Sequence, residues 1–286
     1  MPGKKLSSKY HLPLITRFQG TILKDFKDTR LQRIRKFNHY KALELKSDMI
    51  IMTDDGTEGD KVLQRLGNKT EKIFFWKNGQ DIPLNESFFD TRNAVRDQLE
   101  ISRTAPVLLT VSRLQNWKRV DRAINAMPDV LKRFPDCKLV IVGGGEEYEN
   151  LKSLAEKTGV QDSVIFTGPV EQKDVWKYYS CADIFLSLYD LSNLGNPLME
   201  AMRYGKAIIT LNIGETYKVI ENEVNGILLK QEPFDVSSAI VRLLTDKKLK
   251  NMLGENAKEY AKRNFWSWEE RMKAEVDAVN ALREDF

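Results

Sequence analysis

The sequence predicts an α/β protein with one complete doubly wound parallel-sheet domain and a partial second Rossmann-like domain. The chain has 286 residues, enough for two domains, and its 42% hydrophobic content can form sizeable cores. From about Pro106 onward, short apolar runs alternate with helical patterns, which is typical of a parallel sheet covered by helices. We therefore expect a domain over residues 1–97, linker included, a second over 98–263, and a closing helix within 264–286.

The second domain is predicted to contain six strands. Each is a short apolar run that ends at a polar or glycine-containing turn. The strands are Val107–Val111, Lys138–Val142, Ser163–Thr167, Asp183–Leu188, Lys206–Thr210 and Ile227–Leu229. Helical periodicity predicts helices over Lys118–Phe134, Tyr148–Lys157, Asp174–Cys181, Pro197–Tyr204, Asp235–Leu244, Lys247–Arg263 and Trp268–Arg283.

The first hundred residues predict half a sheet of the same type. Apolar runs indicate strands at Leu12–Thr16, Met49–Thr53 and Lys72–Trp76, with a helix near Thr57–Leu66. Weak periodicity over residues 81–105, which contain two prolines, predicts an irregular linker.

The net charge of +4 is unevenly distributed. Residues 1–100 hold 19 Lys+Arg against 14 Asp+Glu, whereas residues 101–286 hold 26 against 27. The segment Lys24–Lys46 alone carries eight basic residues, and its apolar residues are mostly three apart. This pattern predicts a basic amphipathic helix that contacts an anionic membrane or an anionic acceptor, the alternative being an ordinary surface helix.

Several classes of protein are disfavoured by composition and motifs. No apolar run approaches the roughly 18 residues that span a bilayer. Two cysteines and two histidines make a disulfide scaffold or a His-ligated metal centre improbable, so no metal is expected. The chain has no P-loop, no G-x-G-x-x-G, no G-x-S-x-G and no nucleic-acid module.

Two cations follow the first predicted strand of the second domain. Arg113 and Lys118 lie in the turn after that strand. In doubly wound sheets, ligands bind outside the carboxyl ends of the strands, so both cations can face an anionic ligand there. Alternatively, they are solvated turn residues.

The segment Asp190–Gly205 predicts a second part of the same site. Asn196 suits an N-cap and Pro197 suits the first helical position, so the amides of Leu198 and Met199 are expected to be free and to face the crevice. Glu200 can accept hydrogen bonds from the two hydroxyls of a ribose. The alternative is that Glu200 complements the helix dipole and that Asn196 caps the amides.

Three glycines, Gly143 to Gly145, end the second strand. They permit either a close approach of the backbone to a ligand or a tight turn.

With these residues in place, the chain resembles the family 4 glycosyltransferases of GT-B fold, which are retaining enzymes that use a nucleotide-sugar donor. The likeness runs from about Leu12 to the C-terminus and rests on ordered motifs: VSRLQNWKRVDRAINA, LVIVGGGEEYENL, VIFTGPV with YYSCADIFLSL, and PLMEAMRYGKAIIT.

The resemblance implies a role for each candidate residue. Arg113 and Lys118 would bind the donor diphosphate without a metal, Glu200 would hold the ribose, and the backbone near Val170 would meet the base. The remaining residues of the implied nucleotide-sugar site are Gly143, Ser192, Gly195, Asn196, Leu198 and Met199. The resemblance also implies a glycan or lipid-linked acceptor at the N-terminal domain, a closing helix that packs back toward that domain, and a role in polysaccharide biosynthesis. The lack of a spanning run and of a signal peptide predicts a cytoplasmic protein, and the basic segment Lys24–Lys46 predicts peripheral contact with a membrane.

Three departures from the family pattern leave alternatives open. Ser192 stands where the family has the first glutamate of a paired motif, and Gln19 stands roughly where many members have a histidine. The opening strands of the family have no counterpart, which suggests a fragment of a longer enzyme. The alternatives are a non-catalytic nucleotide-sugar-binding or interaction protein, or a nucleotide-sugar epimerase of the same fold.

Overall fold

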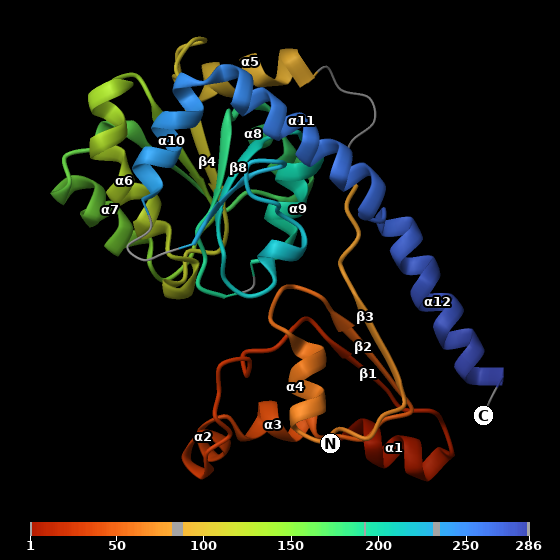
Figure 1. Ribbon diagram of the computed structural model, residues 1–286. Coiled ribbons are helices and arrows are strands. Elements are labelled where there is room, and N and C mark those ends of the chain that lie inside the picture. The colour runs from red at the N-terminus through yellow and green to blue at the C-terminus, as the bar shows by residue number, and fades with distance from the viewer. Residues whose placement is uncertain (1, 82–87, 192, 231–234, 285–286) are drawn as a thin grey trace. The chain divides into compact units, whose positions relative to one another are not determined.

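The computed structural model describes residues 2–81, 88–191, 193–230 and 235–284. The chain divides into two compact units (Figure 1). The first unit combines Met1–Asp81 with Phe265–Phe286, and the second is Ile82–Asn264. The closing helix, α12 (Trp268–Glu284), thus belongs to the first unit although it follows the second in sequence.

The second unit is built on a six-stranded sheet in the order β6-β5-β4-β7-β8-β9. All of its strand pairs are parallel. The strands are β4 (Val107–Val111), β5 (Lys138–Val142), β6 (Val164–Gly168), β7 (Ile184–Ser187), β8 (Ala207–Leu211) and β9 (Ile227–Leu229). The order runs outward from β4 in both directions, which is the doubly wound topology predicted from the sequence.

Helices cover both faces of this sheet (Figure 1). One face carries α6 (Val120–Arg133), α7 (Tyr148–Lys157) and α10 (Val236–Thr245). The other carries α8 (Val175–Cys181), α9 (Asn196–Arg203) and α11 (Lys247–Asn264). Because both faces are covered, the strands can be apolar along their whole length, and every residue of β4, β7 and β8 is buried.

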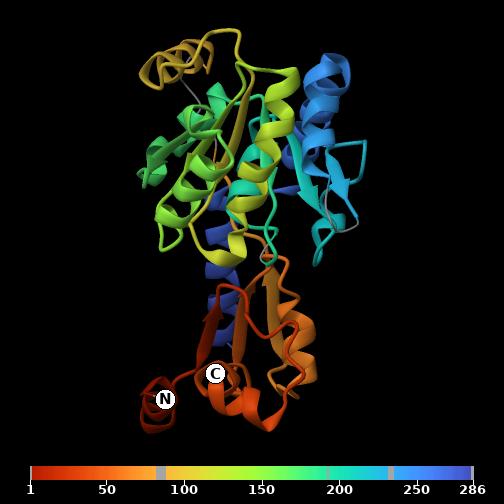
Figure 2. The same ribbon diagram turned by 90° about the vertical axis from the view of Figure 1, so that its left-hand side faces the viewer.

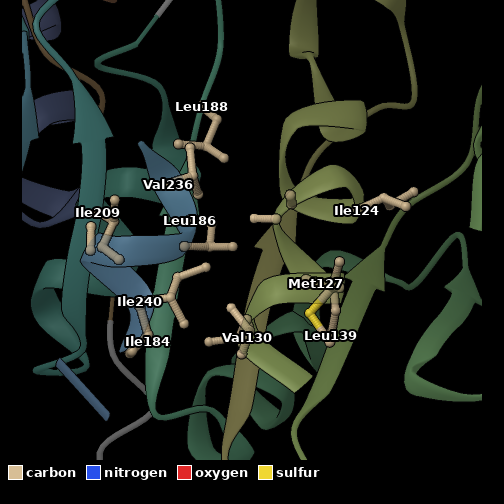
Figure 3. Packing of buried hydrophobic residues seen from close by; sticks show 14 of the residues in the cluster. Ile124, Met127, Val130, Leu139, Ile184, Leu186, Leu188, Ile209, Val236 and Ile240 are labelled. Carbon is tan, nitrogen blue, oxygen red and sulfur yellow. The ribbon is translucent and has the colours of Figure 1, made fainter. Parts of the chain in front are cut away.

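The core of the second unit lies between the sheet and α6 and α10 (Figure 3). Ile124, Met127 and Val130 recur at three-residue spacing along α6 and are fully buried. Each such side chain contributes about 1.5–3 kcal/mol when it is removed from water. Val236 and Ile240 of α10 pack into the same cluster.

Helix α5 (Phe88–Gln98) occupies a segment for which the sequence predicts an irregular linker. Arg96 of this helix is fully buried and donates to the carbonyl oxygens of Ser102 and Ala105, both at 2.8 Å, and of Cys181 at 3.0 Å. It also pairs with Asp183 at 3.2 Å. These long-range contacts fix α5 against α8, so residues 88–97 group with the second unit.

The first unit contains a three-stranded parallel sheet in the order β1-β2-β3, as predicted. The strands are β1 (Ile15–Phe18), β2 (Met49–Thr53) and β3 (Lys72–Trp76). Side chains of β2 alternate between two cores. Ile50 and Met52 pack with α3 (Phe37–Leu43) and α4 (Gly59–Arg65), whereas Met49 and Ile51 pack with α12. Figures 1 and 2 show α4 and α12 on opposite faces of the sheet.

The prediction of one continuous basic helix over Lys24–Lys46 is wrong. The structure has two short helices, α2 (Arg30–Arg35) and α3, separated at Lys36, which has non-helical dihedral angles. Thr29 and Gln32 form a reciprocal capping box that starts α2 at Arg30. A further helix, α1 (Pro2–Tyr10), was not predicted and buries none of its side chains.

Candidate active site

The loops after β4 and β7 meet at the carboxyl edge of the large sheet. Strand β4 pairs with β5 on one side and with β7 on the other, so the strand order reverses here. The Asp190 N–H donates to the Trp117 carbonyl at 3.0 Å, and the Tyr189 hydroxyl donates to the Val111 carbonyl at 2.8 Å. These bonds bring together the two segments that carry the predicted site residues.

Lys118 is held between two aromatic rings. It ends the short 3₁₀ turn Asn116–Lys118 and is 9% exposed. Its ammonium nitrogen lies 4.1 Å from the centroid of the Trp117 ring and 4.0 Å from that of the Tyr189 ring. Such cation–π contacts fix the position of a charge that would otherwise sit on a flexible stem. Arg113 is exposed in the loop after β4.

Two other arginines were not anticipated from the sequence. Arg119 has a left-handed backbone and pairs with Asp121 at 3.0 Å and with Asp190 at 3.2 Å. Arg122 pairs with Asp190 at 2.7 Å and donates to the Leu188 carbonyl at 2.8 Å. These ion pairs fasten the start of the loop after β7.

The start of α9 differs from the prediction. Gly195, not Asn196, is the N-cap, and Asn196 is the first helical residue. The amides of Leu198 and Met199 are not free, because both donate to the Gly195 carbonyl, at 3.1 and 3.4 Å. A ligand at this end of the helix would therefore meet the residues that precede Leu198. Ser192 lies outside the described residues.

Glu200 is fixed by two side chains. The Tyr179 hydroxyl donates to its Oε2 at 2.9 Å, and the Gln172 amide donates to its Oε1 at 3.1 Å. A carboxylate offers about four acceptor positions, so about two remain for a ligand. Burial raises the pKa of Glu200, and the hydrogen bonds from Tyr179 and Gln172 act in the opposite direction.

Buried tyrosines support both Glu200 and Lys118. The fully buried Tyr179 ring stacks on Tyr204, with centroids 5.3 Å apart. Burial raises the pKa of Tyr189, whose ring contacts Lys118. Lys118 and Glu200 thus each contact a buried tyrosine, Tyr189 and Tyr179 respectively. Tyr179, Tyr189 and Gln172 carried no signal in the sequence that would have assigned them to the site.

The glycine turn after β5 is explained by contacts between backbones. Gly143 has φ +136°, and a Cβ atom there would lie 1.9 Å from the Ser112 carbonyl oxygen. A Cβ at Gly145 would lie 2.3 Å from the carbonyl oxygen of Leu114. The glycines thus let this turn pass directly against the loop that carries Arg113. Val170 follows β6, two residues before Gln172, at the same edge of the sheet.

Within the described ranges, no group of three or more His, Cys, Asp or Glu side chains could hold a metal ion. None of the helices in those ranges combines the length and the hydropathy that a membrane span requires.

The fold and the edge-of-sheet site define an α/β protein of the GT-B class, with its two Rossmann-like sheets. The model of the family "Glycosyl transferases group 1" matches residues 91–260. The chain therefore belongs to the group 1 glycosyl transferases.

Two relatives are each similar to more than half of this chain. An uncharacterized glycosyltransferase of Methanocaldococcus jannaschii is 34% identical over 169 residues, which are 58% of this chain and 43% of that protein. A GDP-mannose-dependent alpha-(1-6)-phosphatidylinositol monomannoside mannosyltransferase of Mycobacterium tuberculosis is 30% identical over 172 residues, which are 57% and 44% of the two chains. The aligned part of this chain thus spans less than half the length of these two relatives.

Solved structures share the fold over nearly the whole chain. The Anabaena protein HepE in complex with UDP-glucose superimposes with a TM-score of 0.82 at 19% identity, covering 98% of this chain and 75% of that one. At this level of identity, the likeness concerns the fold.

Proposed function

We propose that this chain binds a nucleotide-sugar and transfers the sugar, with retention of configuration, to a polysaccharide or lipid-linked acceptor. The observation that carries the proposal is the placement of two fixed charged groups after the paired strands β4 and β7, where the strand order reverses. Lys118, held between two aromatic rings, follows β4, and Glu200, held by Tyr179 and Gln172, lies on the helix after β7. A fixed cation suits the diphosphate and a partly buried carboxylate suits the ribose. HepE, which shares the fold, was solved with UDP-glucose, which supports this choice of ligand.

In the proposed reaction, the bond between the anomeric carbon and the donor phosphate oxygen breaks, the oxygen of an acceptor hydroxyl bonds to that carbon, and the hydroxyl proton passes to the departing phosphate. Negative charge grows on the departing nucleoside diphosphate. Lys118 and Arg113 stabilise this charge electrostatically, so the reaction proceeds without a metal. The backbone near Val170 contacts the base, and Gly143, Gly195 and Asn196 surround the sugar and phosphates. Activity that survives an excess of EDTA is expected.

Calorimetric titration of the full chain with UDP, GDP and ADP tests donor binding. We expect one of the three to bind, and we expect Arg113→Ala to weaken that binding about tenfold or more, because one charge-assisted contact contributes about 1.5–3 kcal/mol. Lys132→Ala on α6, whose side chain is 74% exposed, is the matched control and should bind as the parent does. Equal affinity in Arg113→Ala and the parent would contradict the proposal.

Product analysis with the matching nucleotide-sugar separates the catalytic proposal from its alternatives. Sugar transfer or donor hydrolysis supports a transferase. Binding with no turnover supports a non-catalytic nucleotide-sugar-binding protein, and isomerised donor supports an epimerase.

We also propose that the first unit contacts the cytoplasmic face of an anionic membrane, where a lipid-linked acceptor would be presented. Leu31, Ile34 and Phe37 on α2 and α3 are 58%, 65% and 57% exposed. They are interspersed with basic residues, including Arg30 and Arg35, and the segment Lys24–Lys46 carries eight basic residues in all. Apolar side chains beside basic ones suit the interface of an anionic bilayer. The Mycobacterium relative is named for a phosphatidylinositol-linked acceptor, which supports a lipid surface.

Sedimentation with phosphatidylglycerol vesicles tests this contact. The double variant Arg30→Ala, Arg35→Ala should bind about 30-fold more weakly, because each basic residue near the surface contributes about 1 kcal/mol. Met272→Ala, which alters a side chain that is 46% exposed on α12, is the control. Binding that does not depend on the anionic lipid content would overturn the contact.

Whether this chain is part of a longer enzyme stays a proposal. Two observations support this proposal. The alignment with the Methanocaldococcus relative covers 43% of that protein, and β1 lies at an edge of the smaller sheet, where a further strand could pair. The DNA upstream of the first codon would show whether further strands are encoded in frame.

A further inference from the structure

A groove in the second unit lies apart from every residue of the proposed donor site. It is formed between the turn around η4 (Thr216–Lys218), the following loop to Asn225, and the second half of α11. Its volume is about 600 Å³, within the range of small-molecule sites. No residue of the groove takes part in the contacts of Lys118 or Glu200 described above.

The groove is held in place by hydrogen bonds between its two walls. The Tyr260 hydroxyl donates to the Lys218 carbonyl at 3.1 Å, and the Asn256 amide donates to the Val224 carbonyl at 2.7 Å. The buried Asn225 accepts from the Glu221 N–H at 2.8 Å and donates to the Val219 carbonyl at 3.0 Å. The groove is therefore shaped before any ligand arrives.

Two tyrosines line the groove from different elements. Tyr217 lies on the turn and is 56% exposed, and Tyr260 lies on α11. A tyrosine presents a large apolar ring face at a low cost in conformational entropy. Such faces suit the flat apolar C–H surface of a sugar ring.

The groove offers several acceptor oxygens, while its two cationic side chains are paired with carboxylates. Asn256 and Asn264 each donate one amide N–H to a backbone carbonyl, which fixes the side chain and leaves its oxygen and one N–H for a ligand. Glu221 and Glu259 add carboxylates. An acceptor-rich site fits a ligand with many O–H donors, as sugars have, better than a peptide, which brings one carbonyl for each N–H.

Charge argues against an anionic ligand. Lys218 forms an ion pair with Glu215, and Arg263 lies 3.6 Å from Glu259. The lining residues thus include two cations and two carboxylates, Glu221 and Glu259, and have no excess of positive charge.

We infer that this groove is a second binding site, for a neutral oligosaccharide. Tyr217 and Tyr260 contact ring faces, and the oxygens of Asn256, Asn264 and Glu221 accept hydrogen bonds from hydroxyl groups. None of its lining residues belongs to the proposed donor site, and it has no excess of positive charge for a diphosphate, so a neutral glycan fits it better than the nucleotide-sugar does.

Calorimetry on the full chain tests the inference. The probes are neutral tetrasaccharides of glucose, mannose, galactose and N-acetylglucosamine, with tetragalacturonate as the anionic comparison. We expect at least one neutral probe to bind, and we expect Tyr217→Ala to weaken that binding about tenfold, as the loss of one stacking ring would. Met252→Ala on α11, whose side chain is 44% exposed outside the groove, is the matched control and should bind as the parent does.

Titration of the same variants with the nucleoside diphosphate separates this inference from the proposed donor site. Tyr217→Ala should leave nucleotide affinity unchanged, and loss of nucleotide binding in Arg113→Ala should leave tetrasaccharide binding unchanged. Three results would each overturn the inference. They are no binding by any neutral probe, equal affinity of Tyr217→Ala and the parent for the neutral probe, and tighter binding of tetragalacturonate than of every neutral probe.

Discussion

Replacing Lys118 with alanine is expected to lower turnover of the nucleotide-sugar by about 100-fold to 1,000-fold, the range found when one donor is removed from a preorganised site. The ammonium nitrogen is held 4.0 Å from the centroid of the Tyr189 ring, and Lys118 as a whole is 9% exposed, so its charge has a fixed position. The rate of donor hydrolysis, detected as released nucleoside diphosphate, measures this loss of turnover without a known acceptor.

A second substitution separates the loss of charge from the loss of packing. Lys118→Met keeps most of the apolar stem between Trp117 and Tyr189 but removes the cation. We expect Lys118→Met to unfold at nearly the temperature of the parent and to be as slow as Lys118→Ala. Turnover within threefold of the parent in a folded Lys118→Met protein would show that this cation does not act on the diphosphate.

Glu200→Gln is expected to weaken binding of the ribonucleoside diphosphate by about 10-fold to 100-fold, because a hydrogen bond to a charged group contributes about 1.5–3 kcal/mol. The substitution keeps the shape of the side chain and one acceptor oxygen but removes the charge. The 2′,3′-dideoxy ligand is the matched control, because it lacks the hydroxyls that Glu200 would hold. The parent should discriminate between the two ligands, and Glu200→Gln should not.

The same pair of ligands gives a pH test with a definite sign. Burial raises the pKa of Glu200, so its carboxylate becomes protonated at a higher pH than an ordinary glutamate does. Discrimination in favour of the ribonucleotide should be complete above that pKa and should be lost as the pH falls through it. Both ligands carry the same phosphates, so the difference between their affinities reports on the contact between Glu200 and the ribose hydroxyls. If the difference in affinity between the two ligands stays constant through the mildly acidic pH range, Glu200 is not the group that binds the ribose.

Much of the fold could be predicted from local pattern. Strands β2, β3, β4, β5 and β9 have the bounds that the apolar runs predict. These runs can be recognised as strands because strands covered on both faces need apolar residues at every position. Helix α5 was missed because its stability depends on Arg96, whose partners Cys181 and Asp183 are more than 80 residues away.

The site could be predicted only in part. The positions of Arg113, Lys118 and Glu200 after their strands follow from the order of elements. The N-cap was assigned to Asn196 because asparagine caps well in general, yet the geometry of the chain makes Gly195 the residue whose carbonyl accepts the first helical bonds. Tyr189 beside Lys118, and Tyr179 beside Glu200, come from segments whose proximity no local pattern reveals.

The amino-acid sequence by itself determined the α/β class, nearly all the strands and helices of the second unit, and the basic excess of the first hundred residues. These properties depend on side chains close together in the chain. The tertiary structure alone decided which loops meet at the edge of the large sheet, how Glu200 is clamped by Tyr179 and Gln172, and where a second groove forms. The physical reason is that each of these depends on contacts between residues distant in sequence, which exist only once the strands have paired.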